Sequence, residues 1–502
     1  MKTDCTGKDN EHMDPKRSRL LEIFNAQDPH EIGHGVPNAC VGAWFEENVP
    51  SFVSSDTLLE EIFAFRYWTY RKHIRPTPEG HVVTEFLPDV PWSGTYNAIA
   101  CPVAHHIREG RWLADQTFLK DYVAHYAIGK GSRKDVLTYQ NGFVAAAAEY
   151  LLAAGDPSFA REIAPGLCDV FARLKEKHRT SDGLYWADDG YDGMEYSLSG
   201  PGLRPTITSY VYGGGMALAA LLDALGDAET ACTLRSEAFE LREKAEKALW
   251  DEKERFYKTV SASTKEAAPD FERKDAAHDV RELIGYLPFL YDMAPEEHAD
   301  AFRLLCDPLH FYAPFGPTTA DRSHPRFRTV LVDHECLWDG PSWPYATAQT
   351  LSAAIRTMEK GWNSLSREEF ADLLHLYAAS HFLSENGEKR YWIDEDLDPD
   401  DGHWIARTLL KTMPGSIPDR GIWYNHSTFC DLVISGLAGV HPGGDTRAVW
   451  VDIHPLAPQD MTFSLSDLRI AGRTLGVSFE KGKVRVSIDG REAGGEGRYR
   501  LR

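Results

Sequence analysis

The sequence lacks any long apolar run. No stretch approaches the ~20 consecutive apolar residues that a membrane-spanning helix needs. The N-terminal segment MKTDCTGKDNEHMDPKRSRLLEIF also lacks the apolar centre of a secretory signal. These absences predict a cytoplasmic protein that does not span a membrane.

Positive charge is scarce as well. The chain has 54 Lys and Arg against 76 Asp and Glu, which gives a formal net charge of −22. Phosphate backbones and anionic lipids would be repelled by this excess of negative charge. The composition therefore disfavours a role in binding nucleic acid or a membrane surface.

Several chemical motifs are missing. The eight cysteines are scattered without a CxxC pair, which is typical of free, mostly buried thiols in a reducing compartment. The sequence has no HExxH, no zinc-type Cys–His cluster and no GxSxG, and the GGG at 213–215 lies in a helical pattern without a P-loop lysine. We expect no metal and no cofactor.

What the sequence does contain is a repeated helical pattern. Apolar residues recur at i, i+3 and i+4 in segments separated by Gly, Pro and Asp. They predict helices over 56–70, 139–154, 157–178, 206–225, 228–250, 346–358 and 366–384. Such paired segments, with Gly-Asp stops between them, are typical of stacked helical hairpins.

The pattern divides the chain into four parts. Residues 1–18 are predicted to be a flexible tail, 19–97 an N-terminal segment that leads into the helices, and 98–444 the helical domain. Period-two alternation in 445–502 predicts a small β appendage. Two roles remain open for the appendage, namely packing on the helices as a stabiliser and forming contacts in a homo-oligomer.

Two acidic, aromatic loops could carry chemistry. Glycoside hydrolysis needs two converging carboxyls, because one protonates the leaving oxygen and the other activates water or attacks. DGYDGMEYSLSG, which begins at Asp189, and YWIDEDLDPDDGHW, which begins at Tyr391, both offer acids beside aromatic rings. From the residues alone, a solvated turn or a cation site remains an alternative for each, although neither loop has the EF-hand spacing.

Three further clusters combine aromatic and polar residues. LWDGPSWPYAT contains Trp338, Asp339 and Trp343, and AHHIREGRW contains a histidine pair beside Arg108 and Glu109. RGIWYNHSTF places His426 at the start of a helix, where polar ligands are readily held. A structural role is an equal alternative for these residues.

Together, LWDGPSWPYAT, YDGMEYSLSG and the late acidic loop resemble bacterial glycoside hydrolases of family 63 and their relatives, which include mannosylglycerate and glucosylglycerate hydrolases. Trehalases and glucoamylases are more distantly similar. The resemblance implies a mainly α-helical fold, an (α/α)6 barrel of the six-hairpin glycosidase type. It also implies an inverting enzyme that acts on a small α-linked glycoside.

The resemblance also implies the catalytic residues. Glu195 occupies the position of the general acid, although this family usually has Asp there, and Asp189 and Asp192 are alternatives. Glu395 occupies the position of the general base, with Asp394 as an alternative. In an inverting enzyme we expect the two carboxyls to be ~6.5–9.5 Å apart.

The remaining site predictions concern a saccharide substrate. Aromatic faces stack on sugar rings, and charged or amide groups hold hydroxyls. We expect stacking by Trp92, Trp338, Trp343 and Trp392, and polar contacts from Arg108, Glu109, Asn141, Asp192, Asp339 and His426. Two alternative functions are a sugar isomerase or epimerase that uses His105, His106 or His426, and a carbohydrate-binding protein without catalysis.

Overall fold

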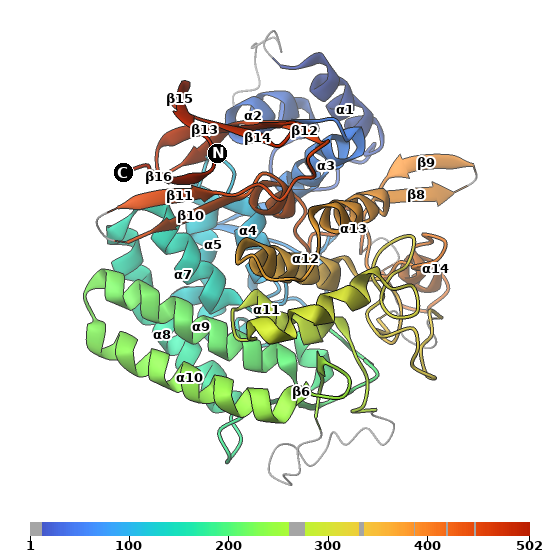
Figure 1. Ribbon diagram of the computed structural model, residues 1–502. Helices are drawn as coiled ribbons and strands as arrows, with labels where there is room; N and C mark the ends of the chain where they lie inside the picture. The colour runs from blue at the N-terminus through green and yellow to red at the C-terminus, as the bar shows by residue number, and fades with distance from the viewer. Residues whose placement is uncertain (1–12, 261–276, 331–335, 386, 418–419, 446–447) are drawn as a thin grey trace.

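The computed structural model describes residues 13–260, 277–330, 336–385, 387–417, 420–445 and 448–502. Figure 1 shows helices through most of the chain and strands concentrated near its C-terminus. Residues 1–12 of the predicted tail lie outside the described part, and the first helix already begins at Pro15. A mainly helical fold with a β appendage is therefore confirmed.

The helices occupy these ranges: α1 Pro15–Ala26, α2 Val41–Asn48, α3 Thr57–His73, α4 Val103–Gly110, α5 Thr117–Ala127, α6 Gly131–Lys134, α7 Phe143–Ala154, α8 Pro157–His178, α9 Pro205–Leu225, α10 Ala228–Leu249, α11 Leu287–Leu290, α12 Pro344–Glu359, α13 Arg367–Ala379 and α14 Ile405–Leu410. A short π-helix, η6, spans Leu432–Leu437. The helices expected from periodicity are present, and the prediction for 366–384 runs past α13 into a strand.

Local signals explain where these helices begin and end. The Asp56 carboxylate accepts hydrogen bonds from the first backbone N–H groups of α3, and Ser366 with Glu369 forms a capping box at α13. Helix α9 ends at Gly226, which has a φ of 98°. An L side chain rarely adopts that conformation, so glycine is favoured at this C-terminus.

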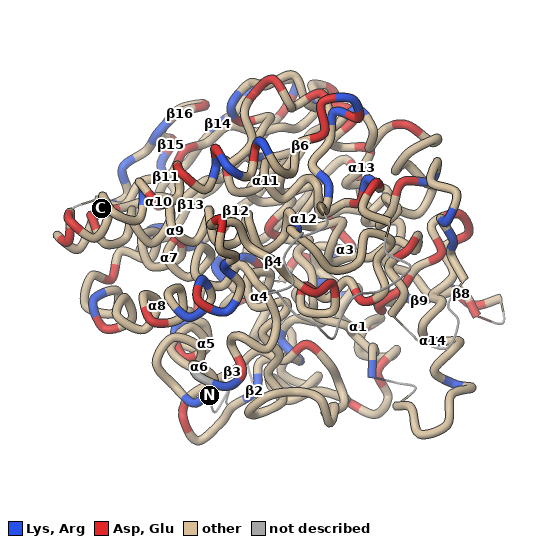
Figure 2. The backbone as a smooth tube through the Cα atoms, turned by 90° about the horizontal axis from the view of Figure 1, so that it is seen from below, with Lys and Arg blue, Asp and Glu red and all other residues tan. Residues whose placement is uncertain are grey.

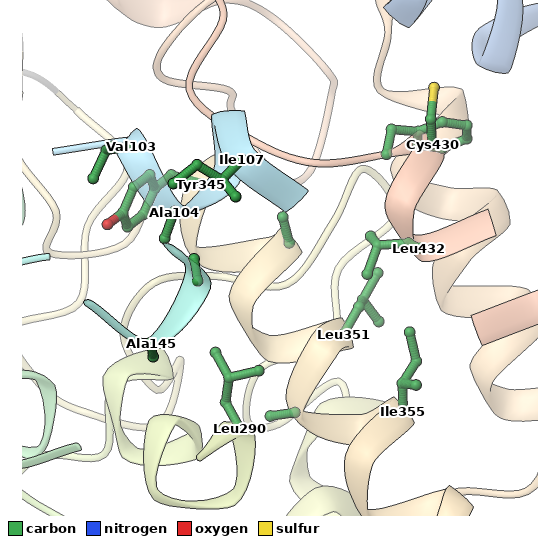
Figure 3. Close-up of a cluster of buried hydrophobic side chains, with 14 of the residues drawn as sticks. Val103, Ala104, Ile107, Ala145, Leu290, Tyr345, Leu351, Ile355, Cys430 and Leu432 are labelled. Carbon is green, nitrogen blue, oxygen red and sulfur yellow. The ribbon is translucent and has the colours of Figure 1, made fainter. Parts of the chain in front are cut away.

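The helices contact one another in a closed ring. Helices α4, α7, α9, α11, α12, α13 and α3 each pack against the next. The ring closes where the Tyr70 hydroxyl of α3 donates to the His106 carbonyl of α4 at 2.8 Å. Figure 3 shows apolar side chains of α4, α7, α11, α12 and η6 meeting in the interior, among them Ile107, Leu290 and Leu351.

Close helix packing explains the glycine triplet in α9. A Cβ atom on Gly213 would overlap the Tyr291 ring, and one on Gly214 would lie 3.2 Å from the Phe171 ring. The triplet therefore lets α9 approach its neighbours closely, which is a packing role.

Half of the sixteen described strands lie in two antiparallel sheets, and the other half form four two-stranded sheets, β2-β3, β4-β5, β6-β7 and β8-β9. The ranges are β1 Ser51–Ser54, β2 Ile74–Thr77, β3 Gly80–Val83, β4 Trp186–Ala187, β5 Gly202–Leu203, β6 Trp250–Asp251, β7 Phe256–Tyr257, β8 Phe382–Glu385, β9 Glu388–Tyr391, β10 Val440–Gly444, β11 Val449–Ile453, β12 Thr462–Ile470, β13 Arg473–Glu480, β14 Lys483–Ile488, β15 Arg491–Gly494 and β16 Gly497–Arg500. One sheet has the order β1-β12-β13-β14-β15 and the other β10-β11-β16. The larger sheet includes β1 from the N-terminal segment, where Ser51 pairs with Ser466.

Cysteine chemistry differs from the prediction at one position. Cys40 is disulfide-bonded, whereas Cys101, Cys168, Cys232, Cys306, Cys336 and Cys430 are free thiols. The prediction of free thiols was wrong for Cys40, because spacing along a chain does not reveal which thiols meet in space. Disulfides are rare in reducing compartments, so this bond does not support the predicted cytoplasmic environment.

The charged residues are spread over the surface elements. Figure 2 shows Asp and Glu on helices and loops throughout the molecule, interspersed with Lys and Arg. In the part of the chain that the structure describes, no helix combines the length and the apolar character needed to cross a membrane.

Candidate active site

Three glutamates from distant parts of the chain form one cluster, in which Glu85 and Glu395 are buried and Glu195 is partly exposed. Glu195 lies in the loop between β4 and β5, and Glu395 follows β9. The third is Glu85, just after β3, which the sequence analysis did not select. The negative charges of Glu195 and Glu395 both raise the pKa of Glu85. The predicted carboxyls of Glu195 and Glu395 therefore lie close enough to interact electrostatically, and Glu85 lies beside them.

A buried ion pair shapes the loop that carries Glu195. The Arg204 Nε atom donates to the Asp192 carboxylate at 2.8 Å, and both side chains are fully buried. Thr206 donates to the same carboxylate at 2.6 Å. At the turn, Gly193 has a φ of 80°. Asp192 thus anchors the loop two residues before Glu195.

The environment of Glu195 favours its protonated form. Burial, followed by the charges of Glu395 and Asp192, raises the pKa of Glu195 to about 8. The backbone N–H of Trp338 donates to the Glu195 carbonyl at 3.2 Å and ties this loop to the tryptophan motif. At neutral pH this side chain can therefore donate a proton.

Glu395, unlike Glu195, has a positively charged partner. The Arg420 Nη2 atom lies 2.9 Å from its Oε2 atom, and both side chains are buried. The Cys336 thiol and the Tyr424 hydroxyl both lie 3.3 Å from Oε1, as donors. The Glu395 carboxylate thus has a cationic partner and two further hydrogen-bond donors.

The two acids beside Glu395 are buried too. Asp394 accepts from the Trp392 indole N–H at 3.2 Å and from the Glu395 backbone N–H at 3.0 Å, and burial raises its pKa to about 6. Burial and the charge of Glu395 raise the pKa of Asp396 well above its usual range. Asp394 is thus engaged within its own loop, and the environment of Asp396 disfavours its charged form.

One group of residues in the described part has the donor atoms for a metal ion. Ligand atoms of Cys336, Glu395 and Asp396 lie within 4.8 Å of one another. A cation there would face the Arg420 guanidinium, which already binds Glu395. Repulsion between the two positive charges disfavours a metal at this position.

Aromatic rings stack in a row beside the acids. The ring centroids of Trp338 and Trp343 are 4.3 Å apart, and those of Trp343 and Tyr345 are 4.4 Å apart. His105 lies against Tyr345 with a centroid distance of 4.4 Å. His426 stacks on Tyr424 at 3.6 Å. The row gives the cluster an apolar wall of the kind that binds sugar faces.

Polar atoms on this wall lack partners in the described residues. Both ring nitrogens of His105 and of His426, and the indole nitrogen of Trp343, are buried without a hydrogen bond to another described group, whereas the Trp338 side chain hydrogen-bonds to Glu195. Buried polar groups in folded proteins normally have a partner. These atoms are therefore suited to the hydroxyls of a ligand.

Trp92 lies at the edge of the cluster. Its side chain is 45% exposed, and its ring lies 5.2 Å from the Arg420 guanidinium. The ring of Phe86 contacts it edge-on at 5.8 Å. Among the predicted stacking residues, Trp92 is the one that faces both solvent and the glutamate cluster.

Other predicted binding residues are engaged elsewhere in the scaffold. The Glu109 carboxylate accepts hydrogen bonds from the backbone N–H groups of residues 429–431. The Asn141 side chain bonds to its own loop and to the first N–H of α7. Arg108 lies 3.9 Å from Glu149 and faces the Tyr291 ring. The structure does not bring these three into contact with the glutamates.

Asp339 and Trp392, two of the predicted substrate-binding residues, already contact other side chains of the protein. Asp339 forms an ion pair with Arg328. Trp392 is buried, donates to Asp394, and has the guanidinium groups of Arg390 and Arg407 over its ring. Both side chains therefore hold the loops that carry the site.

The chain matches the family model of the mannosylglycerate hydrolase MGH1-like glycoside hydrolase domain over residues 95–427. A solved structure named sialidase superimposes with a TM-score of 0.85 at 32% identity, covering 97% of this chain and 44% of that protein. The chain thus spans less than half of that protein's length. Comparison with curated proteins finds no match.

Two other solved structures are similar in fold. The family 78 rhamnosidase of Bacillus sp. GL1 matches with a TM-score of 0.53 at 16% identity, covering 88% of this chain and 41% of that one. The family 63 mannosylglycerate hydrolase from Thermus thermophilus, in complex with Tris, matches with a TM-score of 0.51 at 12% identity, covering 74% and 98%. At these identities the likeness concerns the fold alone.

The family model places this chain among glycoside hydrolase domains. More specifically, this chain belongs to the MGH1-like glycoside hydrolase family, whose model covers two thirds of it. The resemblance to family 63 enzymes that the motifs predicted is confirmed.

Proposed function

We propose that this protein hydrolyses a small α-linked glycoside with inversion of configuration, with Glu195 as the general acid and Glu395 as the general base. The observation that carries the proposal is the opposite environment of two neighbouring carboxyls. Burial and the charge of Glu395 raise the pKa of Glu195 to about 8, while Arg420 pairs with Glu395. One acid that is protonated and one that is ionised are what an inverting hydrolysis requires.

In the proposed reaction Glu195 gives its proton to the glycosidic oxygen as the bond to the anomeric carbon breaks. Glu395 removes a proton from a water molecule that attacks the opposite face of that carbon. The positive charge that develops on the sugar ring is stabilised by the nearby carboxylate. Product release then requires proton exchange with solvent to restore both groups.

The aromatic row would hold the sugar. Trp338 and Trp343 are buried and stacked on each other, so they would form the apolar wall behind the sugar, while the unpartnered nitrogens of His105 and His426 offer polar contacts to hydroxyls. Trp92, which is half exposed, would contact the leaving group. We further propose that residues 98–444 form most of an (α/α)6 barrel, to which α3 of the N-terminal segment also contributes because it packs on α13 and contacts α4.

The histidines do not favour the isomerase alternative. Burial, followed by the charge of Arg108, lowers the pKa of His105 well below its usual range. Burial, followed by the charge of Arg66, does the same for His426. Both nitrogens of His106 contact Tyr122 and the Asn425 carbonyl. A neutral imidazole is a poor proton donor, so carboxyl chemistry is better supported.

The test is a panel of α-linked disaccharides, glucosylglycerate, mannosylglycerate and aryl α-glycosides, with proton NMR to identify the anomer first released. We expect the anomer opposite to that of the substrate. Glu195→Gln and Glu395→Gln should each lower kcat at least ~100-fold, the scale of general acid–base catalysis.

Glu388→Gln is the matched control, because Glu388 is an exposed glutamate in the β8–β9 hairpin. It should retain the wild-type rate. Retention of configuration, or full activity in either catalytic variant, would refute the assignment of the pair.

A further inference from the structure

Glu85 is held against the segment that carries Tyr424. The Asn425 backbone N–H donates to the Glu85 carbonyl at 3.1 Å, and the Asn425 amide donates to the Thr84 carbonyl at 3.1 Å. Leu87 and Gly421 form a parallel bridge two residues further on. These contacts fix a short piece of the N-terminal segment beside the base-carrying loop.

A single hydroxyl lies between two carboxyls. The Tyr424 oxygen is 2.7 Å from Oε1 of Glu85 and 3.3 Å from Oε1 of Glu395. A hydroxyl has one proton to donate, so it cannot donate to both carboxylates at once. If Tyr424 donates to Glu395, the short contact with Glu85 requires that Glu85 carry a proton and donate it to the tyrosine oxygen.

We propose that Glu85 is a third carboxyl of the active site, protonated in the resting enzyme, and that it positions the general base Glu395 through the hydroxyl of Tyr424. This inference rests on the roles proposed above for Glu195 and Glu395. Glu85 is a positioning residue, because it acts through Tyr424 and is not placed against the reacting atoms.

Electrostatics supports the direction of the hydrogen bonds. Three carboxyls share one cluster, and Arg420 forms its ion pair with Glu395. Burial, together with the charges of Glu395 and Glu195, raises the pKa of Glu85 to about 8. Several titratable and charged groups interact electrostatically with Glu85. They include Glu195, Glu395, Arg420, Tyr424, Cys101 and Tyr139.

The chain of hydrogen bonds fixes how Glu395 is presented. Its Oε1 atom accepts from Tyr424 and Cys336, and its Oε2 atom accepts from Arg420. A carboxylate oxygen has two lone-pair positions, so Oε2 keeps one for the attacking water. Loss of the Glu85–Tyr424 contact would let the carboxylate rotate and would misplace that lone pair.

The kinetic test compares three variants on the aryl α-glycoside that the wild type hydrolyses fastest in the panel. Glu85→Leu and Tyr424→Phe each remove the hydrogen-bond chain and should lower kcat ~10- to 100-fold. Glu85→Gln keeps a neutral donor that can reach the tyrosine oxygen, so it should recover most of the loss and be at least ~10-fold faster than Glu85→Leu. The losses in Glu85→Leu and Tyr424→Phe should not add in the double variant, because both break one chain.

A glycosyl fluoride of the same sugar separates this role from that of a general acid. Fluoride leaves without protonation, so a variant that lacks the general acid recovers on this substrate, whereas one with a misplaced base does not. We expect Glu195→Gln to recover and Glu85→Leu to stay slow. Recovery of Glu85→Leu, or a Glu85→Gln variant as slow as Glu85→Leu, would overturn the positioning role.

A measurement without substrate keeps this inference separable from the proposed function. The infrared band of a protonated carboxyl, followed from about pH 6 to about pH 10, should be present in the wild type and reduced in Glu85→Gln. If the band is unchanged in Glu85→Gln, the inference fails even when Glu395→Gln is inactive. If the band is reduced as expected but Glu395→Gln is fully active, the proposed base fails instead.

Discussion

The guanidinium group of Arg420 lies 2.9 Å from Oε2 of Glu395, and both side chains are almost completely buried. Breaking a buried ion pair from one side leaves an uncompensated charge. Arg420 also lies over the rings of Phe86 and Trp92, at 5.5 and 5.2 Å. This arginine thus joins the proposed base to the aromatic edge of the site.

We expect Arg420→Met to lower kcat at neutral pH by at least ~100-fold, because the carboxylate form of the base loses its cation. Steady-state kinetics on the best panel substrate measures the loss. Arg498→Met is the control, because Arg498 pairs with Asp452 on the exposed face of the smaller sheet. A rate for Arg420→Met equal to that of Arg498→Met would exclude the pairing as a catalytic requirement.

The pH dependence of the reaction should show the raised pKa of Glu195. A general acid works only while protonated, and the pKa of Glu195 is raised from 4.5 to about 8. The ratio kcat/KM should therefore stay constant below about pH 8. Above that pH it should fall about tenfold per pH unit, because Glu195 loses its proton. A profile that already declines near pH 5 would mean that an ordinary carboxyl, and not Glu195, is the acid.

The ion pair between Arg204 and Asp192 should matter for stability. Both side chains are fully buried, and Arg204 also donates to Ser199 at 3.0 Å. We expect Arg204→Met to lower the free energy of unfolding by ~3–5 kcal/mol in urea titrations. The exposed pair of Arg498 and Asp452 should behave differently, and Arg498→Met should leave the free energy of unfolding nearly unchanged. Equal effects would show that the Asp192 loop needs no internal charge.

Glu109 gives a prediction that separates structure from binding. Its carboxylate accepts from the N–H groups of Phe429, Cys430 and Asp431, ahead of η6. Glu109→Ala should lower the free energy of unfolding by at least ~2 kcal/mol, because these buried donors lose their acceptor. Urea titration and KM are to be measured together. A raised KM without lost stability would instead indicate that Glu109 binds substrate.

His426 should contribute to sugar binding. Phenylalanine can replace its stacking on Tyr424 but not its nitrogens, which have no partner among the described residues. We expect His426→Phe to lower kcat/KM ~5- to 100-fold, the effect of one or two lost hydrogen bonds. His454→Phe, at an exposed histidine just after β11, is the comparison. No difference between the two variants would remove His426 from the binding site.

Local signals made the helices predictable. Helix α8 spans Pro157–His178 as expected, because Asp156 caps its start and Pro157 can occupy the first turn. Helix α7 was expected from residue 139 but begins at Phe143. The four preceding residues form a loop in which Asn141 bonds to its neighbours, a preference of asparagine that periodicity does not express.

The acid cluster was predictable only where resemblance supplied the residues. Glu195 and Glu395 lie in motifs with aromatic neighbours, which drew attention to them. Glu85 lies in HVVTEFLPDV, where one acid between apolar residues looks like the solvent face of a strand. Its partner Tyr424 is separated from it by 339 positions, and no local pattern reports such a contact.

The pairing of β1 with β12 has a consequence for how the molecule is made. Ser54 pairs with Phe463, so a strand near the start of the chain completes a sheet with strands near its end. During synthesis β1 must wait until residues 462–470 have left the ribosome before its partner strand exists. Shortening the chain before Thr462 would leave β1 as an open strand edge, prone to pairing between molecules. The larger sheet can therefore form only after the barrel helices between its two pairing strands have been synthesised.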